Sequence, residues 1–163
     1  RFPLPRMLLG RKDCDFSFSG LKTAAARIAE TLTTDDQRRD LACAVQAAIA
    51  EQLAERSERA MAAYAIEHEG RGLRFVVAGG VAANQAVRER LTRTAAERGF
   101  SFTAPPLAYC TDNAAMIALA GAERLALGIS DPLDAQARPR WPLDAAAAKA
   151  NPTHVAGRKG AKA

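Results

Sequence analysis

The feature that most constrains the fold is a strand–helix–strand pattern in the middle of the chain. Residues 73–78 form a nearly continuous apolar and β-branched run, which predicts a strand covered on both faces. Gly79-Gly80 ends this run, residues 84–98 have the pattern of an amphipathic helix, and residues 100–103 predict a second short strand. A helix between two such strands predicts a parallel βαβ unit over residues 73–106, and with it an α/β fold.

The residues before this unit predict mostly helix. Residues 15–19 alternate aromatic and polar side chains, the pattern of a short strand, and residues 21–32 predict a helix that follows it. Thr34 and Gln37 then have the spacing of a capping box and predict the start of a long helix, which continues to about His68. The fold class is therefore helix-rich α/β, with a helical insertion before the βαβ unit.

The residues after the unit predict one further helix and a tail. The helix begins near Thr111 and stops at Gly128, and residues 138–144 predict an irregular segment. Residues 145–163 are a low-complexity basic stretch of Ala, Gly and Lys, which cannot bury enough apolar surface to become ordered. We expect one folded domain over residues 1–144, followed by a disordered tail.

Composition and charge exclude several classes of protein. Of 163 residues, 48% are hydrophobic and 25% are charged, which is typical of a globular protein, and no apolar run is long enough to span a membrane. The net charge is +5, but four positive charges without an acid lie in residues 145–163. The remainder is nearly neutral, so charge alone does not indicate nucleic-acid binding. Cys14, Cys43 and Cys110 form no C-x-x-C pair, and we expect three buried, reduced thiols.

The glycine turn after the first strand is the first candidate site. Gly79 and Gly80 lack Cβ atoms, so a ligand could approach the main chain there, close to the start of the next helix. Asn84 offers an amide donor and an acceptor to a ribose, a base or an acyl group. The alternative is an ordinary turn between a strand and a helix, with Asn84 as its N-cap.

The turn after the second strand is the other candidate site. Asp112 lies at the start of a helix, beyond the carboxyl end of the second strand, where ligands collect in open α/β sheets. A carboxylate in this place could bind a cation that in turn binds a phosphate or a carbonyl oxygen. The alternative is again capping, because Thr111, Asp112 and Asn113 all favour helix N-termini.

Taken together, these segments resemble the C-terminal half of a known family. The resemblance covers about residues 1–144 and rests on four motifs in order, at residues 15–23, 77–84, 110–118 and 138–141. The family is that of TsaD, the tRNA adenosine threonylcarbamoyltransferases once called O-sialoglycoprotein endopeptidases or Gcp proteins. It implies a lobe of the ASKHA fold (actin, Hsp70 and hexokinase-like) and a cytoplasmic enzyme. The reaction it implies is transfer of a threonylcarbamoyl group from threonylcarbamoyl-adenylate to the exocyclic amine of the adenosine next to a tRNA anticodon.

The resemblance also assigns roles to individual residues. Asp112 would be a ligand of one divalent metal, iron or zinc, while Asn84 with Gly79 and Gly80 would hold the adenylate or its acyl group. The family's other metal ligands are an H-x-x-x-H pair in the N-terminal half, and this sequence has no such pair. The expected partners are tRNA, the adenylate and further subunits of the threonylcarbamoylation complex, and we expect this chain alone to be inactive.

Two other functions fit the residue patterns less completely. Another ASKHA protein, such as a small-molecule kinase or carbamoyltransferase, would share the Gly-Gly turn but not the motifs at residues 15–23 and 110–118. A non-catalytic α/β binding module is the alternative of a different class. The first residues, Arg1–Arg6, contain neither an initiator Met nor an apolar segment, and we expect the chain to begin inside a longer protein.

Overall fold

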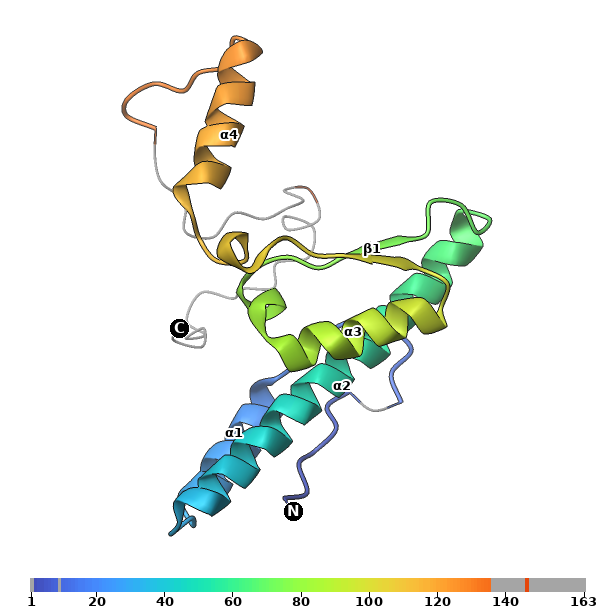
Figure 1. Cartoon of the computed structure of the whole chain (residues 1–163), viewed down its shortest axis with the longest axis vertical. Coiled ribbons are helices and arrows are strands. Elements are labelled where there is room, and N and C mark those ends of the chain that lie inside the picture. Colours follow the sequence, from blue (N-terminus) through green and yellow to red (C-terminus); the bar gives the residue numbers. More distant parts are fainter. Residues whose placement is uncertain (1, 9, 136–145, 147–163) are drawn as a thin grey trace. The chain divides into compact units, whose positions relative to one another are not determined.

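The computed structural model describes residues 2–8, 10–135 and 146, and Figure 1 shows its elements. Contacts divide the chain into two compact units, residues 1–118 and 119–163. The elements are α1 (Ser19–Ala29), α2 (Asp35–Glu67), β1 (Arg74–Val76), the 3-10 helix η1 (Gly80–Ala83), α3 (Gln85–Glu97), β2 (Ser101–Thr103), the 3-10 helix η2 (Leu107–Tyr109) and α4 (Ala114–Ala126).

The predicted parallel βαβ unit is confirmed. β1 pairs with β2 in parallel, with Phe75 opposite Phe102, and α3 connects the two strands. Both rings pack against α2 and α3, which cover one face of this two-stranded sheet. The prediction that the first strand is covered on both faces is wrong, because Val76 is 59% exposed and Arg74 is exposed as well. The alternation of a strand points these two side chains away from the helices, and no described element covers them.

The long helix α2 begins as predicted. The Gln37 backbone N–H donates to Thr34 Oγ1 over 3.3 Å, and Gln37 Oε1 accepts the Thr34 backbone N–H over 3.2 Å, which completes the capping box. Further along, Glu51 accepts a hydrogen bond of 2.7 Å from Arg90 of α3. This hydrogen bond is the main reason that the pKa of Glu51 is lowered and that of Arg90 raised.

The core of the larger unit is the contact between α2 and α3. Ala50 and Ala54 of α2 are buried against Val87 and Leu91 of α3, and the two phenylalanines of the sheet pack on the same cluster. A second cluster continues it with Met61, Ala95 and Phe100. The alanines let the two helix backbones approach closely, so α3 is held between α2 and the strands (Figure 1).

The predicted strand at residues 15–19 is wrong. These residues form no strand, and α1 begins at Ser19, with Gly20 in its first turn. The segment pairs with a helix instead: the Ser17 carbonyl accepts a hydrogen bond of 3.0 Å from Gln52 of α2. The rings of Phe16 and Phe18 stack on each other, with centroids 6.4 Å apart. The alternation of aromatic and polar residues therefore occurs here without a neighbouring strand.

The expectation of three buried thiols holds for one. Cys110 is buried, whereas Cys14 and Cys43 are exposed, and all three are free. Cys14 lies in the irregular segment before α1, and Cys43 lies on an outward face of α2. Small thiols on such surfaces leave no pattern in the sequence that separates them from buried ones.

The C-terminal end of α4 agrees with the prediction. Gly128 has a φ of +71°, and the Ile129 N–H donates to the Arg124 carbonyl over 2.9 Å, a common end for a helix. The predicted irregular segment at residues 138–144 and the boundary at residue 144 lie outside the described residues and stay predictions. Within the described residues, none of the helices combines the length and the apolar character that crossing a membrane requires.

Arg56 of α2 holds the segment before α1 in place. Its guanidinium is fully buried and donates to the carbonyl oxygens of Leu8, Arg11 and Asp13, the last two over 3.0 and 2.7 Å. The segment has no regular structure, so these bonds provide its carbonyl groups with the donors that a helix or a sheet would otherwise supply. A charged donor makes such bonds stronger than those between neutral groups.

We predict that Arg56→Met lowers the free energy of unfolding by about 2–3 kcal/mol, because three carbonyl groups lose the charged donor that the buried guanidinium provides. Urea denaturation measures this change. The control is Arg93→Met, which alters an exposed arginine on α3 and should change the free energy of unfolding little. Equal effects of the two substitutions would contradict the role of Arg56.

Candidate functional site

The turn after β1 is open to its surroundings. Gly79 has a φ of +87°, a conformation that L-residues rarely adopt, which explains the glycine at this position. A Cβ atom added at Gly79 or Gly80 would meet no atom within 4 Å, so the space next to both is free. Helix α3 begins at Gln85, in agreement with the predicted start near residue 84, and Gly80 is the first residue of η1, the short helix that precedes it. The approach to the main chain at both glycines is therefore open.

Asn84 is the N-cap of α3, as the alternative interpretation of this residue predicted. Its Oδ1 accepts a hydrogen bond of 3.1 Å from the Val87 N–H, and its Nδ2 donates over 3.0 Å to Oε1 of Gln46 on α2. An amide can donate two hydrogen bonds and accept two, so capping occupies only part of its capacity. The structure shows the capping role and leaves ligand binding by Asn84 as a prediction.

A hollow of about 820 Å³ lies beside this turn. Its walls are mostly apolar and come from α1, from α2, from η1 and from the start of α3. The lining residues are Ala25, Ala26, Ala29, Leu32, Arg38, Leu41, Ala42, Val45, Gln46, Ile49, Gly80, Val81, Asn84 and Val87. Predicted site residues Gly80 and Asn84 thus lie at one hollow, whose volume is in the range of small-molecule sites.

Asp112 lies in the turn after β2, where the sequence placed it. It is exposed and makes no hydrogen bond or ion pair with any of the described residues. Asn113 caps α4 instead: its Oδ1 accepts the Met116 N–H over 3.0 Å, and its Nδ2 donates to the Thr111 carbonyl over 3.0 Å. The capping alternative for Asp112 is therefore wrong, and its carboxylate is available to a ligand.

A complete metal site is not formed by the part of the chain that the structure describes. No group of three or more His, Cys, Asp or Glu residues is close enough there to hold a metal ion. The Asp112 carboxylate is a suitable oxygen ligand for a divalent cation, but it is a single ligand. Any metal bound at Asp112 needs further ligands from outside these residues.

The two predicted turns share one edge of the sheet. Val76 at the end of β1 pairs with Thr103 at the end of β2, so both turns leave the carboxyl ends of neighbouring parallel strands. No contact joins Asp112 to Asn84. The structure therefore brings Gly80 and Asn84 to one hollow, and Asp112 is not among the residues that line it.

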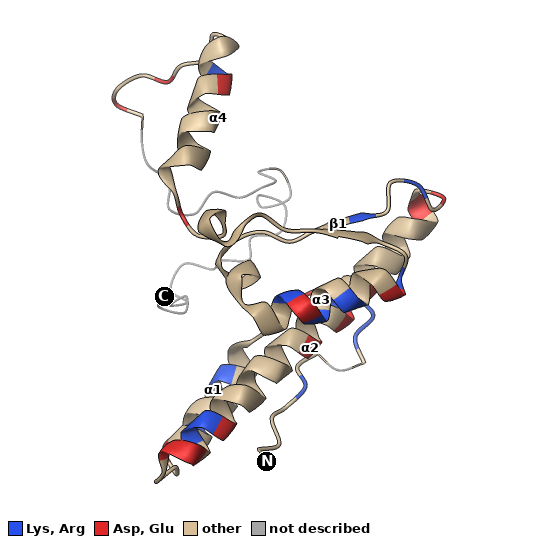
Figure 2. Cartoon of the chain, in the orientation of Figure 1, with Lys and Arg blue, Asp and Glu red and all other residues tan. Residues whose placement is uncertain are grey.

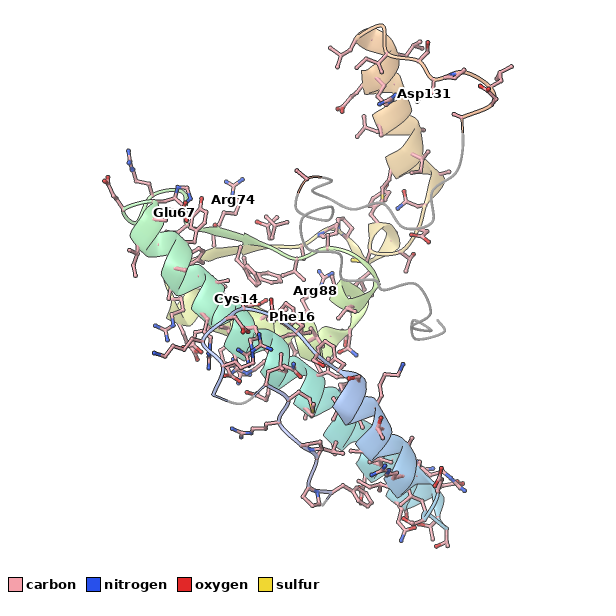
Figure 3. All side chains as sticks on the ribbon, turned by 180° about the vertical axis from the view of Figure 1, so that it is seen from behind. Cys14, Phe16, Glu67, Arg74, Arg88 and Asp131 are labelled. Carbon is pink, nitrogen blue, oxygen red and sulfur yellow. The ribbon has the colours of Figure 1, made fainter. Side chains whose placement is uncertain are left out.

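Arg88 of α3, labelled in Figure 3, is a site residue that the sequence analysis missed. Its Nε donates to the Ala82 carbonyl in the turn after β1, over 2.9 Å. Its Nη2 lies 3.2 Å from the Pro105 carbonyl and 3.3 Å from Cys110 Sγ, both in the turn after β2. One guanidinium therefore links the two candidate turns. The only signal in the sequence was its position one helical turn after Asn84.

Charge is not concentrated at this edge. Figure 2 shows basic and acidic residues side by side on α2 and α3, whereas the charged residues of α1 are the basic Lys22 and Arg27. Many of those on α2 and α3 form ion pairs, such as Arg38 with Asp35 and Arg98 with Glu58. Helices α2 and α3 therefore present both signs of charge, in agreement with the near-neutral charge of this part of the sequence.

Comparison with known proteins agrees with this arrangement. A sequence model of the family "TsaD: tRNA N6-adenosine threonylcarbamoyltransferase" matches residues 1–119. Proteins named tRNA N6-adenosine threonylcarbamoyltransferase are 76% identical in Caulobacter vibrioides and 55% identical in Maricaulis maris, in both cases over all of this chain and 44% of the relative. The Rhodospirillum rubrum protein of the same name is 52% identical over 92% of this chain and 42% of its own length.

The fold is that of a helix-rich α/β protein, with both candidate turns at the carboxyl ends of two parallel strands. The matches identify it further: the chain belongs to the TsaD family. It spans less than half the length of the curated relatives that it matches.

We predict that Arg88→Met increases amide hydrogen exchange in both turns, at residues 79–84 and 105–111, because both lose their shared donor. Exchange measured by mass spectrometry or NMR tests this. Arg98→Met is the control, since it removes only an ion pair at the surface of α3 and should leave both turns protected. A change confined to one turn would show that Arg88 does not link them.

Proposed function

We propose that this chain is the part of a tRNA threonylcarbamoyltransferase that holds the adenylate and supplies one metal ligand. The whole enzyme would transfer the threonylcarbamoyl group from its adenylate to the exocyclic amine of the adenosine next to a tRNA anticodon. The observation that carries the proposal is the open Gly79-Gly80 turn, which leads into an apolar hollow with Asn84 at its wall. Membership of the TsaD family supports it.

The hollow suits a nucleoside. Apolar side chains of α1 and α2 would bury the faces of a flat base and gain free energy as water leaves them. The glycines would let a ribose or phosphate come close to the main chain, and Asn84 would donate to an acceptor atom of the ligand. This arrangement is consistent with the small number of polar side chains among the lining residues.

Asp112 would ligate a divalent metal, iron or zinc, together with histidines that the family resemblance places outside this chain. Its carboxylate has no competing partner among the described residues, which fits this role. When bound, such a metal supplies a Lewis acid that polarises an acyl or phosphoryl oxygen. The contribution of this chain is to hold the carboxylate at the sheet edge beside the adenylate.

The proposal extends to the fold and the partners. The helix-rich α/β arrangement with a parallel sheet is consistent with a lobe of the ASKHA fold. The partners would be tRNA, threonylcarbamoyl-adenylate and other subunits of the modification complex, in the cytoplasm. The names of the relatives favour this activity over a small-molecule kinase or a binding module without catalysis.

We predict that Asp112→Ala in a full-length family protein carrying this sequence abolishes metal retention and transfer. The free energy of unfolding should change by less than about 0.5 kcal/mol, because the exposed Asp112 side chain makes no hydrogen bond or ion pair with the described residues. The matched control is Asn113→Ala, which removes the cap of α4, costs about 1 kcal/mol and leaves the metal bound. Metal content, transfer rate and urea denaturation are measured for both. A fully metallated, active Asp112→Ala protein would overturn the assignment.

We also predict that the isolated chain transfers no threonylcarbamoyl group. Asp112 is a single ligand, and the described residues provide no others. The measurement is incorporation of labelled threonine into tRNA from threonylcarbamoyl-adenylate, with the full-length protein as positive control. Turnover by the purified chain would show that its own residues complete the site.

A further inference from the structure

Gln46 is a polar residue of the hollow that the proposed function does not use. It is exposed on α2, far along the chain from the glycine turn, yet its Oε1 accepts a hydrogen bond of 3.0 Å from Asn84 Nδ2. Of the residues that line the hollow, Gln46 and Asn84 have the only uncharged polar side chains, and the one charged residue, Arg38, is paired with Asp35. The contact between them is therefore the main polar feature of the wall.

The direction of this hydrogen bond follows from the backbone. The Val87 N–H can only donate, so the atom of Asn84 that it contacts must be the oxygen, Oδ1. The nitrogen, Nδ2, then faces Gln46 and requires an acceptor, which only Oε1 of Gln46 can provide. The N-cap of α3 thus sets the orientations of both amides.

Two contacts on opposite sides of one amide hold the Asn84 side chain in a single orientation. The N-cap bond alone would leave the side chain free to rock about its Cβ–Cγ bond, whose rotation is soft. The bond to Gln46 uses one of the two hydrogens of Nδ2 and leaves the other for a ligand. Ordering this group before binding lowers the entropy cost of forming the next hydrogen bond.

We propose that Gln46 is a positioning residue for the nucleoside site: by accepting from Asn84, it presents the second amide hydrogen of Asn84 to the ligand. This rests on the proposed function, in which Asn84 contacts the adenylate. The role requires an acceptor at the end of the residue 46 side chain and does not require its amide nitrogen. A carboxylate of the same length would therefore serve, and an apolar side chain would not.

The test compares Gln46→Leu, Gln46→Glu and Asn84→Ala in a full-length family protein carrying this sequence. The probe is adenosine, which is neutral, so that the added carboxylate does not act through repulsion of a phosphate. Gln85→Leu is the control, since it makes the same chemical change at an exposed glutamine that does not line the hollow. Calorimetry gives the affinities, and NMR of the Asn84 side-chain amide gives its hydrogen exchange in the free protein.

We expect Asn84→Ala and Gln46→Leu each to weaken adenosine binding by about fivefold, the effect of one neutral hydrogen bond. Gln46→Glu and Gln85→Leu should stay within about twofold of the unchanged protein. The Asn84 side-chain amide should exchange faster in Gln46→Leu than in Gln46→Glu. Because Gln46 is exposed, its substitutions should leave the melting temperature unchanged.

The outcomes separate the two proposals. If Asn84→Ala weakens binding and Gln46→Leu does not, the positioning role is wrong and the nucleoside site stands. If Gln46→Glu weakens binding as much as Gln46→Leu, Gln46 acts through its nitrogen and positioning is again wrong. If Asn84→Ala has no effect, the assignment of Asn84 to the nucleoside fails, and the role of Gln46 fails with it.

Discussion

The close contact of α3 with α2 is the constraint on which the rest of the larger unit depends. Ala50 and Ala54 bring the two helix axes together, and α3 in turn fixes the strands through Phe75 and Phe102. Asn84 and Arg88 both belong to the start of α3, so this packing also sets where the two candidate turns lie. A bulkier side chain at either alanine would move the site as well as the core.

Arginine side chains order the parts of the chain that have no regular structure. Arg56 binds the carbonyl groups of the segment before α1, and Arg88 binds those of the turns after both strands. In each case a helix provides a rigid base and the planar guanidinium reaches several oxygens at once. Irregular segments beside the core therefore keep defined positions, which a ligand site built from turns requires.

The parts of the fold that sequence predicted correctly depend on neighbouring residues. The capping box needs only Thr34 and Gln37, and the end of the last helix needs only Gly128. The strand expected at residues 15–19 was wrong because an alternating pattern does not provide a neighbouring strand: the two aromatic rings stack on each other, and the Ser17 carbonyl bonds to a side chain of α2. The prediction that both faces of β1 are buried was also wrong. An apolar strand sequence indicates a preference for burial, but the arrangement of the other helices and strands decides whether a face is covered.

The sequence by itself determined the parallel βαβ unit, the glycine turn, the family and the candidate residues Asn84 and Asp112. It left open whether each residue caps a helix, because both functions select the same residue types. Tertiary structure decided which residues are caps: Asn84 caps α3, and Asn113, not Asp112, caps α4. Tertiary structure also brought together the hydrogen-bonded pairs Asn84–Gln46 and Arg88–Cys110, whose members are 38 and 22 residues apart in the sequence. Local preferences act over one helical turn, so only the packing of α3 between α2 and the sheet could bring such residues together.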